Sequence, residues 1–292
     1  MTIADISVVC ANYNNATFLP GFFDAWIKSS IAPREILFVD DGSKDDSVAI
    51  ARDYQKVFPY LQVIELNQNR GFGNALNAGV AHATGKYILR IDPDDVTMPD
   101  RLEKQLHLLE SGQADVVGSN AIFFQSNTGK EVGVTNFPIR HEDIAKTILR
   151  GEHGILHSTV MARVELFRKH PYLQGNVPAE DYDIFARMLR SGARFANISE
   201  PLLRCRIHQL SVSNILPFST IAKTYQLRDQ IFGTRTSRLA VILYYTHIKF
   251  YRKFLFAPNK TSRLMYLALA SILRPDKAFK RVLPPIRLKY FQ

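Results

Sequence analysis

Two absences narrow the class of this chain before any motif is considered. Its 292 residues include only two cysteines, Cys10 and Cys205, which excludes a disulfide framework and indicates a reducing compartment. No uninterrupted apolar stretch approaches the roughly 18 residues that a membrane-spanning helix needs. Residues 1–5 also lack the basic and apolar regions of a signal peptide. The sequence therefore predicts a cytoplasmic protein without a membrane span.

Acidic residues are almost missing from the last quarter of the chain. Residues 219–292 hold fifteen Lys or Arg but only two acidic residues, a balance of +13, whereas the remainder holds 22 basic and 25 acidic residues, a balance of −3. Aromatic residues are interleaved with these charges, among them Tyr244, Tyr251 and Phe254. Such a basic, aromatic-rich helical segment is typical of an element that lies on an anionic membrane surface.

Two other interpretations of residues 219–292 are open. The segment could be a nucleic-acid surface, or a helical cap on the rest of the chain. Its apolar content exceeds what phosphate binding needs, so we favour the membrane surface and expect no nucleic-acid partner. The sequence does not indicate an oligomeric state.

The first 118 residues alternate between short apolar runs and helical patterns. Strands are expected over 6–11, 35–39, 62–66, 87–91 and 115–117, and helices over 18–30, 45–58, 73–83 and 99–109. Short apolar runs joined by helices are typical of a parallel sheet that is covered on both faces. The fold class is therefore α/β, with a doubly wound, Rossmann-like unit.

The pattern changes after Gly118. A hairpin is expected over 121–125 and 131–135, helices over 143–149 and 181–190, and strands over 158–162, 195–198 and 202–207. With 46% hydrophobic residues, the chain can bury a core in one large domain with an appendage. We divide it into 1–118, 119–215 and a basic helical extension, 216–292.

Two groups of carboxylates follow predicted strands. Asp92, Asp94 and Asp95 come directly after the run 87–91, and Asp40 and Asp41 follow the run 35–39. The carboxyl ends of parallel strands meet at one edge of a sheet, where ligands bind. Three clustered carboxylates suit Mg²⁺ or Mn²⁺, whose shell substrate phosphates can complete. The alternative is a solvated acidic turn.

Seven short motifs occur in an order that is similar to glycosyltransferase family 2. They are Ser7–Val9 with Tyr13 and Asn14; Phe38–Ser43; Asn69–Gly71 with Ala75, Asn77 and Gly79; Gly85–Ile88; Asp92–Asp95; Glu180–Asp183; and Arg206–His208 with Ser211. Together they cover roughly residues 5–213. Each motif alone is weak, but their shared order and spacing make the resemblance specific.

The resemblance implies a GT-A fold and an inverting, metal-dependent transfer. A sugar would pass from a nucleotide-sugar, most often a UDP-sugar, to a hydroxyl of a glycan or lipid-linked saccharide, as in surface polysaccharide or glycoconjugate biosynthesis at the cytoplasmic membrane face. Residues 1–118 would bind the nucleotide-sugar and 119–215 the acceptor, with Mn²⁺ or Mg²⁺ as cofactor. The alternatives are transfer to polyprenyl phosphate and a non-catalytic nucleotide-sugar-binding module.

The same resemblance implies a role for individual residues. Asp181 would be the catalytic base, with Glu180 as the second candidate and a helix N-cap as the alternative role of Asp181. The nucleotide-sugar would contact seven residues: Ala11, Tyr13, Asp41, Arg70, Asp92, Asp94 and Arg206. The metal would be bound by Asp94, Asp95 and His208.

For two of these residues a structural role is the alternative. Asp41 is expected to accept from the uracil N3–H, because an ionised carboxylate is a good acceptor; otherwise it caps the next helix. His208 could likewise be structural rather than a metal ligand.

Overall fold

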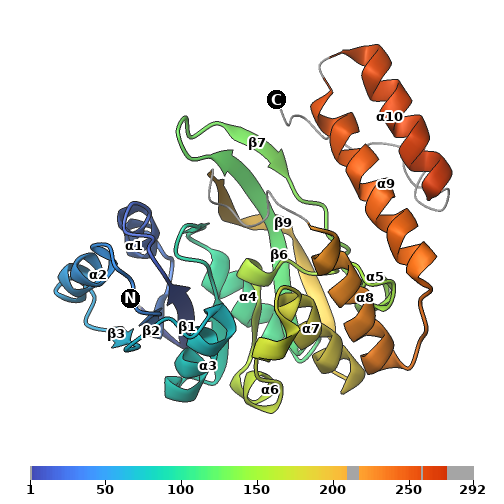
Figure 1. Cartoon of the computed structure of the whole chain (residues 1–292). Helices are drawn as coiled ribbons and strands as arrows, with labels where there is room; N and C mark the ends of the chain where they lie inside the picture. The colour runs from blue at the N-terminus through green and yellow to red at the C-terminus, as the bar shows by residue number, and fades with distance from the viewer. Residues whose placement is uncertain (1, 209–216, 258, 275–292) are drawn as a thin grey trace.

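The computed structural model (Figure 1) describes residues 2–208, 217–257 and 259–274. Its strands form one mixed sheet with the order β3-β2-β1-β4-β8-β6-β9-β5. The strands are β1 (Ile3–Asn12), β2 (Ala32–Asp40), β3 (Leu61–Glu65), β4 (Tyr87–Arg90), β5 (Val96–Thr97), β6 (Val116–Gln125), β7 (Glu131–Val134), β8 (Met161–Arg163) and β9 (Phe195–Ile207). The first four are parallel, β8 runs antiparallel between β4 and β6, and β7 forms a hairpin with β6. The predicted α/β class is confirmed.

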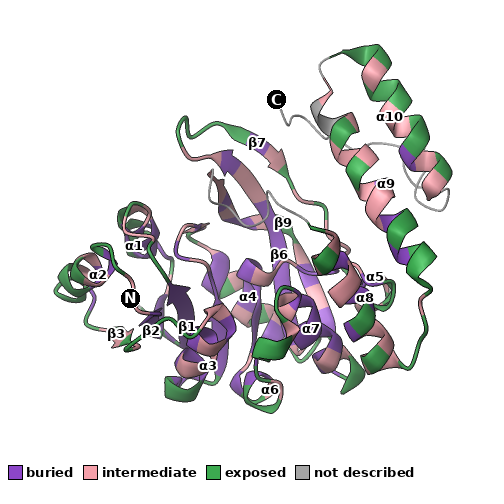
Figure 2. Ribbon diagram, viewed as in Figure 1, coloured by how far each residue is buried: buried purple, intermediate pink, exposed green. Residues whose placement is uncertain are grey.

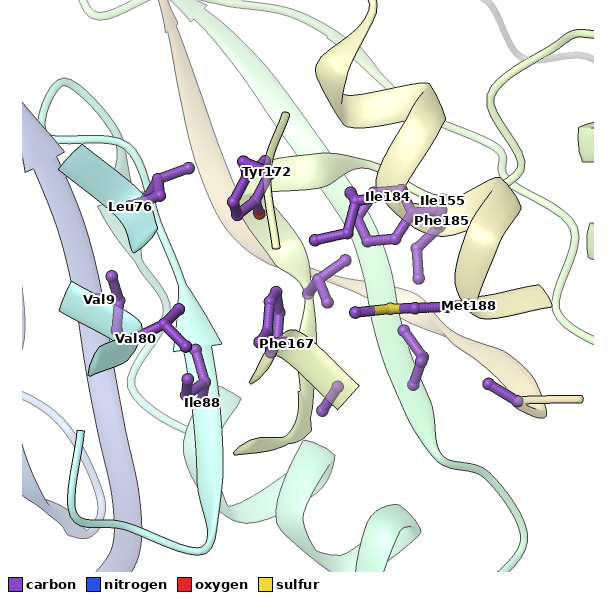
Figure 3. Close-up of a cluster of buried hydrophobic side chains, with 14 of the residues drawn as sticks. Val9, Leu76, Val80, Ile88, Ile155, Phe167, Tyr172, Ile184, Phe185 and Met188 are labelled. Atoms are coloured by element: carbon purple, nitrogen blue, oxygen red, sulfur yellow. The ribbon is translucent and has the colours of Figure 1, made fainter. Parts of the chain in front are cut away.

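Helices cover both faces of the sheet, as the apolar runs predicted. They are α1 (Leu19–Ile27), α2 (Ser47–Gln55), α3 (Phe72–His82), α4 (Arg101–Glu110), α5 (His141–Leu149), α6 (Val164–Lys169), α7 (Glu180–Arg190), α8 (Phe218–Phe232), α9 (Arg238–Phe256) and α10 (Lys260–Leu273). Successive strand residues point to opposite faces. On β1, Val8 packs with α1 and α4, whereas Val9 packs with α3 (Figure 3).

In two places, segments that were predicted as two separate strands form one continuous strand. The segment 115–117 and the hairpin arm 121–125 both belong to β6, and 195–198 and 202–207 both belong to β9. In the sequence, the polar stretch around Asn120 resembles a break between two strands. In the structure, the strand pairing is irregular at this point, and the Asn120 side chain supplies hydrogen bonds there. Its Oδ1 accepts from Thr135 Oγ1 at 2.9 Å, and its Nδ2 donates to the Ser199 carbonyl at 2.9 Å.

Other boundaries also differ from the sequence pattern. The strand expected over 158–162 begins only at Met161, because residues 157–159 form a 3₁₀ turn. Helix α4 begins at Arg101 rather than at Pro99. The helix α6 and the short strand β5 were not predicted, and both are too short to give a periodic signal.

The basic extension divides into two parts. Helix α8 packs on α7, and Leu227 is buried in the same core cluster as Phe185. Helices α9 and α10 pack against each other and extend from the body, with α10 largely exposed (Figure 2). The predicted boundary at 215/216 lies outside the described residues, so the domain division stays a prediction. None of the helices described is both long and apolar enough to cross a membrane.

Candidate active site

The ends of β1 and β2 form the first wall of the site. Asp40 accepts hydrogen bonds from Asn12 Nδ2 at 2.8 Å, and from the backbone N–H and the hydroxyl of Ser43 at 2.8 and 2.6 Å. The Ser43 hydroxyl in turn accepts from the backbone N–H of Asn14 at 2.9 Å. Asp40 is therefore a structural residue that joins the two strand ends. Ala11 is buried in β1, and Tyr13 follows this strand with 43% of its surface exposed.

Asp41 holds the loop that precedes α3. Its two carboxylate oxygens accept from the backbone N–H groups of Arg70 and Gly71, at 2.8 and 2.9 Å, and its side chain is buried. The alternative that Asp41 caps the next helix, α2, is wrong, because its partners lie at the start of α3. A carboxylate has about four acceptor positions, so two of them remain for a base. The side chain of Arg70 is exposed beside this loop.

Three predicted site acids converge where β4 ends: Asp94 and Asp95, predicted to bind the metal, and Asp92, predicted to bind the nucleotide-sugar. Asp92, Asp94 and Asp95 each offer a carboxylate oxygen within 4.8 Å of the others. Burial, together with the charges of Asp94 and Asp92, raises the pKa of Asp95 well above its usual range. An all-oxygen cluster of this kind fits Mg²⁺ or Mn²⁺. The solvated-turn alternative is wrong for Asp95, which is 4% exposed.

Each carboxylate of the trio has a different partner. Asp92 pairs with Arg90 through both guanidinium Nη atoms. Asp95 accepts from the backbone N–H of Arg206 at 3.0 Å. Asp94 lies 3.0 Å from His208 Nε2, so the structure brings these two predicted metal ligands together. Ser211, the last residue of the motif, lies outside the described residues.

Guanidinium groups already balance much of this negative charge. Arg90 and Arg101 are buried next to the trio, and the Arg206 side chain lies between the rings of Phe18 and Phe124. Arg101 donates to the carbonyls of Arg90 and Ser158, and burial lowers its pKa to about 9. The protein thus supplies cations of its own at the acidic trio, in addition to any metal that the three carboxylates bind.

Asp181 and Glu180 are the first two residues of α7. The N-cap of α7 is Ala179, so the N-cap alternative for Asp181 is wrong. Its Oδ2 lies 3.7 Å from His153 Nδ1, and its Oδ1 accepts from the Tyr182 N–H at 2.7 Å. Burial raises the pKa of Asp92, and the charge of Asp181 adds to the rise, so the two acids share one site.

An aromatic wall between these acids was not predicted. Tyr172 donates to or accepts from His157 Nε2 at 2.6 Å, and the ring of Phe72 lies edge-on to the His157 ring. Burial, with the charge of Arg90, lowers the pKa of His157 well below its usual range. This imidazole is therefore neutral at pH 7. Nothing in the local sequence pattern connects these three residues, because they come from different segments.

Arg90 is also a site residue that the motifs missed. It interrupts the apolar run Tyr87–Ile91 and stands two positions before Asp92. Side chains two positions apart in an extended chain lie on the same face. This spacing is the one signal in the sequence that could have predicted the pair.

Comparisons with known proteins identify the family and the fold of the chain. Residues 7–171 match the family described as Glycosyl transferase family 2. The amylovoran biosynthesis glycosyltransferase AmsE of Erwinia amylovora is 31% identical over 173 residues, which cover 59% of this chain and 64% of AmsE. Two solved structures share the fold. TarS of S. aureus, in complex with UDP-GlcNAc, has a TM-score of 0.66 at 17% identity and covers 95% of this chain and 83% of its own.

The second is the mannosyltransferase PcManGT from Pyrobaculum calidifontis, in complex with GDP-Man and Mn²⁺. Its TM-score is 0.57 at 17% identity, and the match covers 97% of this chain and 82% of that one. At such identities the likeness concerns the fold alone, whereas the family match spans more than half of the chain. The chain therefore belongs to glycosyltransferase family 2 and is a glycosyltransferase with the GT-A fold.

Proposed function

We propose that this enzyme transfers a sugar from a UDP-sugar to a hydroxyl group of a saccharide or lipid-linked acceptor, with inversion at the anomeric carbon and with Mn²⁺ or Mg²⁺ as cofactor. The partly exposed Asp181, whose charge acts on Asp92 of the acidic trio, supports this most directly. A candidate base close to a diphosphate site fits an in-line displacement, in which the acceptor attacks opposite the leaving group.

The chain's own residues divide the work of this reaction. Asp41 accepts from the uracil N3–H while it holds the loop at Arg70. Arg206 offers a guanidinium to the phosphate oxygens, and Asp181 takes the proton of the acceptor hydroxyl. Asp94, Asp95 and His208 hold the cation. When bound, this cation screens the donor diphosphate and stabilises the charge on the leaving nucleoside diphosphate.

The proposed acceptor is a hydroxyl of a saccharide or of a lipid-linked saccharide. AmsE is named for amylovoran biosynthesis, which supports a role in polysaccharide assembly here. Transfer to polyprenyl phosphate is the second candidate. Such an acceptor is already an anion, so it needs no base and the loss of Asp181 would matter little.

A panel of sugar nucleotides tests the donor. We expect release of nucleoside diphosphate from one or more UDP-sugars in the presence of Mn²⁺, and much slower release from GDP-sugars. The physical reason is that Asp41 recognises a base that presents an N–H between two carbonyls. Thymine presents the same edge as uracil, so this contact does not separate dTDP-sugars from UDP-sugars. Faster release from a GDP-sugar than from the UDP-sugars would contradict the proposal that Asp41 recognises uracil.

We also propose that helices α9 and α10 contact an anionic membrane surface. Residues 238–274 contain seven Lys or Arg and no acidic residue. Large apolar side chains are exposed on both helices: Leu239, Ile242 and Leu243 on α9, and Leu264, Met265, Leu269 and Ile272 on α10. A second copy of this acid-free surface would repel the first, whereas anionic lipid offers both opposite charge and apolar chains.

Charge reversal tests this surface in the full-length protein. The triple substitution Lys249→Glu, Lys253→Glu and Lys260→Glu should weaken binding to phosphatidylserine-containing vesicles by about a hundredfold or more, because each basic residue contributes about 1 kcal/mol. Co-sedimentation at low and high salt measures it. The matched control reverses three exposed lysines of the body, Lys28, Lys56 and Lys130. Equal loss in the control, or unchanged vesicle binding in the triple variant, would contradict the proposal.

A further inference from the structure

Arg90 is a buried cation in the middle of the acidic site. It is the last residue of β4 and is 3% exposed. Its Nη1 donates to Asp92 Oδ2 at 2.8 Å, and its Nη2 donates to the other oxygen of the same carboxylate. The guanidinium carbon lies 5.0 Å from the centre of the Phe72 ring. Arg90 is thus fixed on two sides, by a bidentate ion pair and by an aromatic face.

This pairing distinguishes Asp92 from the other two acids. Both of its oxygens are engaged by the Arg90 fork, and its negative charge is cancelled at close range. Asp94 instead lies against the ring of His208, and Asp95 accepts from the backbone of Arg206. Among the described contacts, Asp92 has both oxygens held by a guanidinium, whereas Asp94 and Asp95 have no such bidentate pair, so a metal ion attracted to the trio would meet carboxylate oxygens free of an arginine fork at Asp94 and Asp95.

Two buried polar atoms near this pair have no hydrogen-bond partner among the described residues. They are Arg90 Nε, a donor, and Glu180 Oε2, an acceptor. Arg90 ends β4, and Glu180 is the first residue of α7. A hydroxyl group can accept from an atom such as the first, and a hydroxyl group can donate to an atom such as the second. A sugar is a molecule that brings such groups.

We propose that Arg90 is a positioning residue: it fixes the Asp92 carboxylate and cancels its charge, which keeps Asp92 available to sugar hydroxyls and outside the shell of the metal that the proposed function assigns to Asp94 and Asp95. This inference rests on the proposed metal-dependent transfer. It predicts that a variant without the buried Arg90 cation binds the metal more tightly than the wild type. If Arg90 instead supported a metal-ligating Asp92 from behind, its loss would weaken metal binding by about 10–100-fold.

The experiment measures the Kd of Mn²⁺ alone by calorimetry for the full-length protein and four variants. Arg90→Gln should bind Mn²⁺ about three- to tenfold more tightly, because an uncompensated carboxylate then faces the ion. Asp92→Asn should bind it more weakly by a similar factor, because the charge of Arg90 is then unpaired. The double variant Arg90→Gln/Asp92→Asn should return to within about twofold of the wild type. Asp94→Asn should lose most of its Mn²⁺ affinity.

Rescue in the double variant is the decisive result. If the double variant binds Mn²⁺ as weakly as Asp92→Asn, then Asp92 ligates the metal and the proposal is overturned. A thermal melt of each variant confirms folding, and if Arg90→Gln alone does not fold, the comparison of Asp92→Asn with the double variant still decides. The double variant should bind Mn²⁺ normally but transfer sugar slowly, which a purely structural ion pair would not produce. Absence of Mn²⁺ binding by the wild type, both alone and in the presence of UDP, would instead reject the metal-dependent function itself.

Discussion

Replacement of Asp181 by asparagine is expected to slow sugar transfer by about 10²–10⁴-fold while the Kd of UDP changes little. Asparagine keeps the shape of the side chain and removes its basicity, so the acceptor hydroxyl keeps its proton when it attacks. The carboxylate lies at the start of α7 and is partly exposed, as a group that meets an incoming acceptor must be. Transfer is measured by release of nucleoside diphosphate at saturating donor, and UDP binding by calorimetry.

Glu180→Gln is the matched control, because Glu180 is the neighbouring acid and the second candidate for the base. Its Oε2 is buried, whereas the Asp181 carboxylate is partly exposed, so Glu180 is the less accessible of the two to an incoming acceptor. A base role for Asp181 requires that Glu180→Gln retain clearly more activity than Asp181→Asn. Wild-type transfer by Asp181→Asn would assign the base elsewhere, or would favour polyprenyl phosphate as acceptor.

The sheet was predictable because its strands are buried on both faces. Runs such as Ile36–Val39 are apolar at every position, which indicates a central strand, and the helical patterns between them predict parallel neighbours. Strands that carry polar residues in their middle were cut short instead. Asn120 looks like a turn residue in the sequence, yet its side chain repairs a register shift between β6 and β9 that only the folded structure contains.

The summed charge of a segment did not predict which of its helices pack on the body. We treated residues 216–292 as one basic extension, but the structure places Leu227 of α8 in the main core. The exposed acid-free surface belongs to α9 and α10. The composition of residues 216–292 averages over the partly buried helix α8 and the more exposed helices α9 and α10. It does not show which of these helices packs against the body.

In the site, the residues that lie in motifs were predictable and their partners were not. Asp92, Asp94 and Asp95 stand together in the chain, so their clustering follows from the sequence. Arg101, by contrast, reaches the trio from α4, through contacts with backbone carbonyls that the sequence gives no reason to expect. Whether the three acids need a bound metal ion depends on arginines such as Arg101. The metal dependence therefore has to be measured and does not follow from the acidic motif alone.

Removal of divalent cations is expected to reduce transfer by about a thousandfold, with recovery on addition of Mn²⁺ or Mg²⁺. Charge stabilisation by a bound cation contributes several kcal/mol to the transition state, which corresponds to a rate effect of this size. The guanidinium groups of Arg90, Arg101 and Arg206 reduce the loss, because they supply positive charge without the metal. The measurement is initial transfer rate after dialysis against EDTA, followed by titration with each metal.

Variants separate the metal site from a general salt effect. Asp94→Asn should need far more Mn²⁺ for half-maximal activity, because it removes the carboxylate that faces His208. The surface variant Asp53→Asn, which removes an exposed carboxylate paired with Lys56, should show the wild-type Mn²⁺ requirement. Full transfer in metal-free buffer would mean that the three arginines alone stabilise the leaving diphosphate, and the acidic trio would then serve the sugar and the fold rather than a metal.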